Sequence, residues 1–290
     1  MSPGALAALA AAVLATSWGA PLARLTSAAP LAVAMWRMLL AALILLPYAV
    51  WRGGGVPPRH RPAAVVAGIA LGLHFGTWIP SLWLTSVSAS VVLVSTAPLW
   101  VLLASPRLLG VPIRRRNLAS FSLALLGVAV ISWGDLRFSS RALLGDALAL
   151  AGAVCVAVYL IVGKRLRSEV PLPRYLAVVY SGAALTLLAG VLVLGVDPLP
   201  ETRVAWLPLL AMAVGPTLTG HTLLNWTLAR LEAYRVNLAV LFEPVLASLW
   251  TFLVIGEAPP PHVVPGAVLV LAALALEFLP GGGERVDKVC

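Results

Sequence analysis

Ten apolar stretches, each close to twenty residues long, fill almost all of this sequence of 290 residues. The hydrocarbon core of a bilayer is about 30 Å thick, and a helix crosses it in roughly 20 residues at about 1.5 Å per residue. Ten such segments use roughly 200 residues and leave only short connections. Hydrophobic residues make up 61% of the chain and charged residues 11%, unlike soluble domains. The sequence therefore predicts an all-α integral membrane protein.

The predicted spans form two sets of five. The first set is Pro3–Leu25, Leu31–Trp51, Ala63–Thr85, Ser88–Ser105 and Leu118–Trp133; the second is Leu144–Gly163, Pro173–Gly195, Trp206–Leu228, Tyr234–Gly256 and His262–Leu279. These sets predict an N-terminal repeat over residues 1–134, a C-terminal repeat over 142–280 and a flexible cytoplasmic tail over 281–290. An odd number of spans per set makes the second set enter the membrane from the opposite side, which gives two inverted five-helix repeats.

The basic residues alternate between successive connections. With the N-terminus inside, fifteen Lys and Arg residues fall on cytoplasmic connections and the tail, against four outside: Arg24, Arg137, Arg141 and Arg203. Basic residues in short loops stay cytoplasmic, so we expect both termini in the cytoplasm. The net charge of +9 follows from this topology, and we favour membrane anchoring over nucleic-acid binding for the run 114–116.

The third span carries two different faces. Gly68, Gly72 and Gly76 form a small-residue stripe, which allows close helix approach in lipid. His74 and Trp78 lie nearly opposite, one helical turn apart, and this polar face is left to meet a cavity. A histidine there can instead be satisfied by a hydrogen bond to a neighbouring helix.

Matched polar residues and prolines support the repeat. Adding 147 to the numbers of His74 and Trp78 gives His221 and Asn225 in the eighth span. Pro98 and Pro244, in the fourth and ninth spans, are 146 residues apart. Each proline removes a backbone N–H and frees a carbonyl, at Val94 and Val240 respectively. Matched interruptions point to a transporter's binding site or gate, although such kinks can simply shape the bundle.

These features resemble a known family: five plus five spans, Ser17-Trp18-Gly19 ending the first span, Arg37 in the second, small residues before Pro98 and Pro244, and Gly256-Glu257 after the ninth. The chain resembles the EamA-type branch of the drug/metabolite transporter superfamily, and within it the bacterial ten-span exporters of aromatic and other amino acids. Val111 stands where the family tends to have an acidic residue. The resemblance implies a basket of helices around a central cavity that opens alternately to each side.

Several residues within the spans are candidates for lining such a cavity. Aromatic rings there can stack on a substrate side chain, although tryptophan is also common at membrane interfaces. Trp100 is in addition a candidate for a cation–π contact with a substrate ammonium group. Asparagines can hold a carboxylate or amide, or tie helices together. The candidates are Trp18, His74, Trp78, Trp100, Tyr159, His221, Asn225 and Asn237.

Three ionisable residues within the predicted spans need a partner or a role, because charge in lipid is costly; Glu277, near the end of the last span, is expected to reach the interface. Arg37 can pair with a helix carbonyl or hold a substrate carboxylate. Glu243 can relay protons, contact a substrate ammonium group, or bind a backbone amide next to Pro244.

The sequence thus predicts export of a small zwitterionic solute by alternating access, and the resemblance implies amino acids, with broad specificity that includes aromatic ones. The partners are the bilayer and this solute, with no cofactor or metal. The alternative cargo is a drug or another small metabolite, exported with proton coupling. An enzyme is disfavoured, because the histidines form no His-Glu-x-x-His run and no Gly-x-Ser-x-Gly elbow occurs. Cys155 and Cys290 suggest neither a disulfide nor a metal site. We expect a bacterial inner-membrane protein that works as a monomer.

Overall fold

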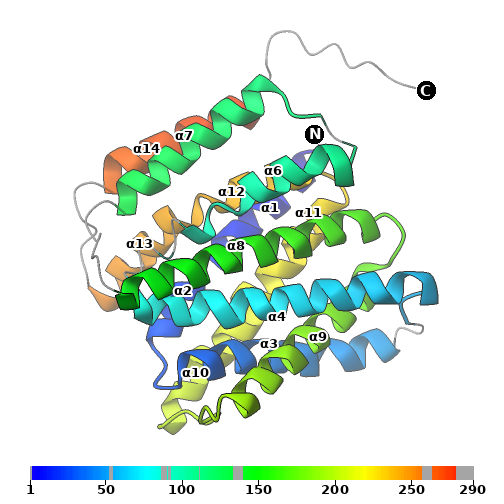
Figure 1. Cartoon of the computed structure of the whole chain (residues 1–290), viewed down its shortest axis with the longest axis vertical. Coiled ribbons are helices and arrows are strands. Elements are labelled where there is room, and N and C mark those ends of the chain that lie inside the picture. Colours follow the sequence, from blue (N-terminus) through cyan, green and yellow to red (C-terminus); the bar gives the residue numbers. More distant parts are fainter. Residues whose placement is uncertain are drawn as a thin grey trace.

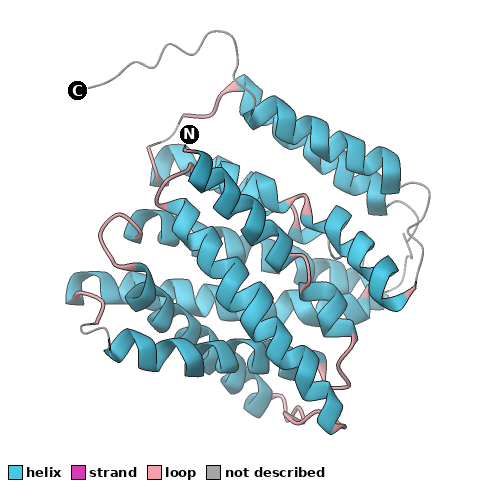
Figure 2. Cartoon of the chain, turned by 180° about the vertical axis from the view of Figure 1, so that it is seen from behind, coloured by secondary structure: helices cyan, strands magenta, loops and turns pink. Residues whose placement is uncertain are grey.

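The computed structural model describes residues 2–51, 55–85, 90, 93–110, 112–132, 140–256 and 263–278. Helices account for every regular element among these residues, and no strand occurs in them (Figures 1 and 2). The all-α prediction is therefore confirmed. Its cause is that a chain surrounded by lipid must satisfy its backbone hydrogen bonds internally, which a helix does within one segment.

The helices follow one another with short connections. In the N-terminal half they are α1 (Pro3–Thr16), α2 (Gly19–Arg24), α3 (Pro30–Trp51), η1 (Pro58–His60), α4 (Arg61–Leu84), α6 (Ala97–Leu108) and α7 (Arg115–Ser132). In the C-terminal half they are α8 (Ser140–Leu166), α9 (Leu172–Val193), η3 (Arg203–Ala205), α10 (Trp206–Met212), the π-helix η4 (Ala213–His221), α11 (Thr222–Leu228), α12 (Ala233–Val240), α13 (Glu243–Ile255) and α14 (Val263–Phe278).

Six segments are long and apolar enough to cross a membrane: Pro3–Arg24, Pro30–Trp51, Pro58–Leu84, Ser140–Leu166, Leu172–Val193 and Arg203–Leu228. They coincide with the first three predicted spans of each half. The fourth, fifth, ninth and tenth predicted spans correspond to α6, α7, α12 with α13, and α14, which do not reach the same length and apolarity within the described residues. The predicted span ends at Ser88, Trp133, His262 and Leu279 lie outside those residues.

Two predicted spans are broken rather than continuous, which corrects the sequence-based assignment. The first ends its α1 helix where the hydroxyls of Thr16 and Ser17 bond the carbonyls of Val13 and Leu14, a competition that weakens a helix. The ninth breaks at residues 241–242, just before Pro244. In the eighth, the helix widens to the π form around Pro216. The unwound positions lie in the interior of the bundle.

Helix α4 is the central element of the bundle and packs on α8 and α9 (Figure 1). A Cβ atom at Gly72 would lie 2.8 Å from the Thr186 Cβ and 2.9 Å from the Ala183 carbonyl, so the bare glycine is what lets α4 and α9 approach closely. At one end of the molecule α7 pairs with α14 (Figure 1). This pair joins the rest through a small apolar cluster that includes Leu238 and Leu241.

Candidate functional site

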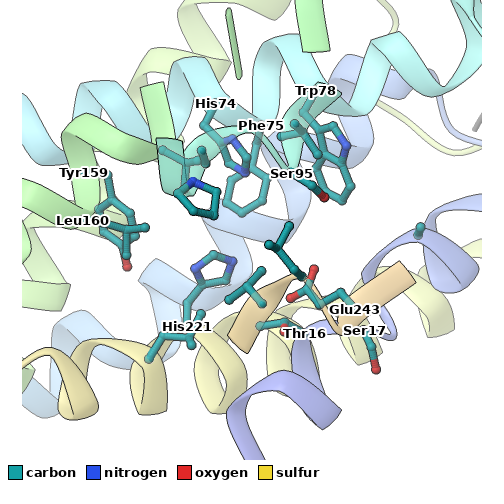
Figure 3. Close-up of a pocket in the computed structure, with 18 of the residues that line it drawn as sticks. Thr16, Ser17, His74, Phe75, Trp78, Ser95, Tyr159, Leu160, His221 and Glu243 are labelled. Atoms are coloured by element: carbon teal, nitrogen blue, oxygen red, sulfur yellow. The ribbon is translucent and has the colours of Figure 1, made fainter. Parts of the chain in front are cut away.

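A cavity of about 100 Å³ lies where the broken helices meet α4 and α8. Figure 3 shows His74, Phe75 and Trp78 on one side of it, with His221, Thr16 and Glu243 facing them. The wall is mostly apolar or aromatic, with a few polar groups, as in small-molecule sites generally. The polar and aromatic residues on it are Thr16, Ser17, Arg37, His74, Phe75, Trp78, Ser95, Tyr159, His221 and Glu243.

An aromatic cluster forms one side of the cavity. His74 stacks on Trp78 at 5.8 Å between ring centroids, and His221 meets the edge of Phe75 at 5.4 Å. His74 Nδ1 lies 3.0 Å from the Gly152 carbonyl, and since a carbonyl only accepts, Nδ1 carries the proton. The structure thus combines the two sequence-based alternatives for His74, because one nitrogen ties α4 to α8 while the ring lies on the cavity wall.

Arg37 and Glu243 place opposite charges on the same cavity wall. Arg37 is 2% exposed, its Nε donates to Thr217 Oγ1 at 2.7 Å, and its guanidinium carbon lies 4.1 Å from the centroid of the Phe75 ring. Glu243 is the first residue of α13 and lines the cavity together with Thr16. Among the lining residues that the structure describes, these are the only Arg or Lys and the only acid.

Asn225 lies behind the cavity wall rather than on it. It is fully buried, and its Nδ2 donates both to the Tyr159 hydroxyl and to the His221 carbonyl, the latter at 2.8 Å. The structure thus places Asn225 behind residues that line the cavity, and its contact with a substrate stays a prediction. Its amide holds two lining residues, Tyr159 on α8 and His221 on η4, in fixed positions.

Two fully buried polar atoms of the cavity-lining residues have no hydrogen-bond partner among the described residues. They are the indole Nε1 of Trp78 and Nδ1 of His221. Buried polar groups are nearly always paired in folded proteins, and an unpaired one calls for an explanation. Both side chains line the cavity, but these two atoms are themselves covered by protein in this conformation.

The matched prolines occupy helix starts. Pro98 is the second residue of α6 and Pro244 the second residue of α13, positions where the missing N–H costs nothing because the first turn has no intrahelical acceptor. At Pro244 the predicted mid-span kink is instead a break between α12 and α13, and at Pro98 residues 95–96 form a turn directly before α6. Both prolines line the cavity together with Val94 and Val240.

Two tryptophans predicted to line the cavity lie elsewhere. Trp100 is 38% exposed and points away from the buried face of α6, which carries Val101 and Leu102. Trp18 is stacked on Trp250 at 4.8 Å, next to the cavity but not on its wall. The position of Trp100 follows from the helical periodicity of α6, and the position of Trp18 follows from the break after α1. The Asn237 side chain lies outside the described part of the structure.

The model of the EamA-like transporter family matches the sequence twice, over residues 2–133 and 143–279. The chain belongs to the EamA-like transporter family. With its apolar helices, this membership makes it a multi-pass membrane transporter protein. Its EamA relatives include an uncharacterized transporter of Archaeoglobus fulgidus, 24% identical over 85% of this chain and 87% of the relative.

Further relatives carry more or less specific names. A probable amino-acid metabolite efflux pump of Salmonella typhimurium is 28% identical over 61% of each chain. The uncharacterized transporter YdfC of Bacillus subtilis is 23% identical over 85% of this chain and 81% of its own. A solved crystal structure overlays 96% of this chain and 98% of its own with a TM-score of 0.79 and 21% identity. At that identity the likeness shows a shared fold and nothing about cargo.

Sequence reasoning did not identify several residues that contribute to the site of this EamA-like protein. Phe75 reads as an ordinary apolar residue, although its place beside His74 gave a hint. Thr217 and Trp250 approach Arg37 and Trp18 from parts of the chain 180 and 232 positions away. No local sequence pattern predicts contacts between residues so far apart in the chain. Ser17, just after α1, was singled out only as part of the family-like Ser17-Trp18-Gly19 motif, and Thr16 was not singled out.

Proposed function

We propose that this protein exports amino acids from a bacterial cell by alternating access, and that it catalyses no chemical reaction. The observation that carries the proposal is the pairing of Arg37 and Glu243 on the wall of one cavity that is otherwise largely apolar and aromatic. A free amino acid has the complementary groups: a carboxylate for Arg37, an ammonium group for Glu243 and a side chain for the rings. The name of the Salmonella typhimurium relative agrees with this cargo class.

We further propose ten spans in two inverted repeats, over residues 1–134 and 142–280, with the tail 281–290 in the cytoplasm. The double match of one family model supports two related halves. The helix contacts support the inversion: α3 packs on its counterpart α9, α7 packs on its counterpart α14, and the α4–α8 contact is mirrored by α1 packing on η4 and α11. Elements beside a pseudo-two-fold axis pair in this way.

Contacts between connections support cytoplasmic termini. Three connections predicted to be cytoplasmic touch one another: Arg59 forms an ion pair with Glu169 at 2.9 Å, and Arg165 donates to the Leu108 carbonyl at 2.8 Å. On the predicted outer side, the guanidinium of Arg141 bonds the Trp83 carbonyl at 3.4 Å. Each of these contacts joins segments that are predicted to lie on the same side of the membrane. The excess of basic residues supports the cytoplasmic side of the inner membrane for the first set of connections.

The decisive experiment is uptake into liposomes that contain the purified protein, with a panel of labelled amino acids and with or without a pH gradient. Saturable flux of several amino acids that survives collapse of the gradient is the expected result, and it would identify a facilitative carrier. Flux that vanishes with the gradient would assign proton coupling. Absence of amino-acid flux in folded protein would refute the proposed cargo.

A second candidate function is proton-coupled export of cationic drugs or other small metabolites. The observation in its favour is Glu243, because a carboxylate in a largely apolar cavity can hold a cation or exchange a proton for it. Arg37 argues against a cationic cargo, since its fixed positive charge lies on the same wall. Substitution of Glu243 separates the two functions, as described in the Discussion.

A further inference from the structure

Arg37 is held in a single orientation by two different contacts. Its Nε donates to Thr217 Oγ1 at 2.7 Å, and its planar guanidinium lies over the Phe75 ring at 4.1 Å. Among the residues that the structure describes, no other hydrogen bond to this guanidinium occurs. One edge and one face of the group are therefore taken, while the residue still lines the cavity.

Thr217 owes its role as a hydrogen-bond acceptor to the π-helix. Pro216 has no N–H to offer the carbonyl of Met212, four residues before it, and the Thr217 hydroxyl donates to that carbonyl instead, at 3.0 Å. The single hydroxyl proton is thereby used, and the oxygen faces Arg37 as an acceptor. The Tyr180 hydroxyl donates to the Thr217 carbonyl at 3.2 Å, which fixes the backbone at this point.

With Nε engaged, the remaining donors of Arg37 are Nη1 and Nη2. Two parallel N–H groups of a guanidinium match the two oxygens of a carboxylate in a bidentate pair. Glu243 is the acid on the same wall, but no ion pair joins it to Arg37 among the described residues, so a solute carboxylate is the anion that can pair directly with the Nη edge. We propose that Thr217 is a positioning residue that presents the Nη edge of Arg37 to the cavity, so that the carried solute must bear a carboxylate. This inference deepens the proposed amino-acid export and rests on it for the identity of the cargo.

The chain provides a matched control for Thr217 within the same π-helix. Thr219 also donates its hydroxyl to the carbonyl five residues before it, Val214, at 3.0 Å, but its side chain is exposed and faces away from Arg37. Thr217→Val removes the acceptor for Arg37 together with a hydroxyl-to-carbonyl bond. Thr219→Val removes only a hydroxyl-to-carbonyl hydrogen bond. Thr217→Ser keeps the hydroxyl and should rescue binding.

The test is equilibrium dialysis of the purified full-length protein against three labelled probes that share one ring: phenylalanine, its decarboxylated amine phenethylamine, and 3-phenylpropionate, which lacks the amine. In Thr217→Val we expect affinity for the two carboxylates to fall about tenfold, the size expected for a lost hydrogen bond to a charged group. Binding of phenethylamine should not change. Thr217→Ser and Thr219→Val should behave like the wild type with all three probes.

The possible outcomes separate this inference from the proposed function. Equal weakening of phenethylamine binding, or unchanged carboxylate binding, would overturn the positioning role of Thr217, and so would failure of the wild type to bind either carboxylate. Selective loss of 3-phenylpropionate binding in a protein that transports no amino acid would uphold Thr217 and refute amino-acid export. If Thr217→Val unfolds in a thermal melt, Thr217→Ala removes the same hydroxyl and is put through the same comparison.

Discussion

Trp250 on α13 stacks on Trp18, in the break between α1 and α2, with ring centroids 4.8 Å apart and an interplanar angle of 14°. The Trp250 indole Nε1 also donates to Ser17 Oγ at 2.7 Å. Ser17 lines the cavity, so this contact joins two broken helices directly at the cavity edge. Alternating access requires contacts of this kind between helices to form and break. An aromatic stack with one hydrogen bond can stabilise one state and still break during a transport cycle.

Replacement of Trp250 should therefore open this side of the cavity. Loss of the stack and its hydrogen bond removes about 2 kcal/mol in total. We expect Trp250→Ala to accelerate labelling of a cysteine placed at the cavity residue Ala20 by up to roughly thirtyfold, measured with a membrane-impermeant thiol reagent after Cys155 and Cys290 are changed to serine. Trp250→Phe keeps a ring, so its labelling rate should lie between those of the wild type and Trp250→Ala. Equal labelling rates in all three proteins would show that the stack does not control access.

The α4–α9 contact gives a stability prediction. In Gly72→Ala the new methyl group would meet Thr186 and Ala183 at less than 3.0 Å, and overpacking of this kind costs about 1–3 kcal/mol. The thermal midpoint of the purified protein should fall accordingly. Gly190→Ala is the control on α9, where the nearest side-chain atom, Leu31 Cδ2, is 3.7 Å from the added methyl group. A drop of equal size in both variants would contradict close packing as the cause.

Asn225 should tolerate aspartate poorly. Its Nδ2 donates to the His221 carbonyl and the Tyr159 hydroxyl, and a carboxylate would present an acceptor to the carbonyl instead. We expect Asn225→Asp to lose about 1–3 kcal/mol of stability in denaturant or thermal unfolding. At Asn117 the side-chain Oδ1 accepts from the Arg114 backbone N–H at 2.9 Å, so Asn117→Asp keeps this bond and should cost less than Asn225→Asp. Similar losses at both sites would indicate a general effect of added charge.

Glu243→Gln distinguishes the two candidate cargoes. For a zwitterionic solute the Arg37 contact persists, so we expect transport to continue with a KM raised about tenfold by the loss of one charge-assisted hydrogen bond. For a cationic drug the variant removes the one acid found among the described lining residues, and transport should stop. Flux of labelled phenylalanine and of a cationic dye into liposomes gives the two readouts. Abolished phenylalanine flux in folded variant protein would count against the amino-acid assignment.

Membrane topology can be checked independently of transport. Both termini are proposed to lie in the cytoplasm, so reporters fused after the tail should fluoresce as cytoplasmic green fluorescent protein and lack activity as periplasmic alkaline phosphatase. A fusion within the connection between α9 and η3, predicted to be outside, should behave in the opposite way. The reverse pattern would invert the proposed orientation.

The sequence predicted the elements whose signals are local. Apolar length placed the first three spans of each half, because a helix in lipid depends on its own composition. The spacing of His74 and Trp78 placed both on the cavity wall, since helical periodicity fixes a shared face. The glycine stripe likewise anticipated close packing, which the approach of Gly72 to α9 illustrates.

The parts that sequence reasoning missed depend on where helices break and rotate. Trp100 was assigned by residue type, but its place on α6 is set by the burial of Val101 and Leu102 on the other face. Asn225 was assigned to the cavity because it lies 147 residues after Trp78. Only its hydrogen bond to Tyr159 of α8 shows that it holds a lining residue in place. The Arg37–Thr217 bond joins residues 180 positions apart. Such pairings follow from tertiary packing and have no local signature.

The π-helix at Ala213–His221 has no counterpart in the first half, because the residues 147 positions earlier belong to the regular helix α4. Under the proposed alternating access of two inverted repeats, the two halves do not exchange conformations at equal energy, and we expect the inward-facing and outward-facing states to differ in population at rest. For passive transport, the quotient of maximal rate and KM must nevertheless be equal in both directions. The carrier is thus expected to show a low KM with slow turnover on one face of the membrane and a high KM with fast turnover on the other, which is a kinetic rectification that needs no ion gradient.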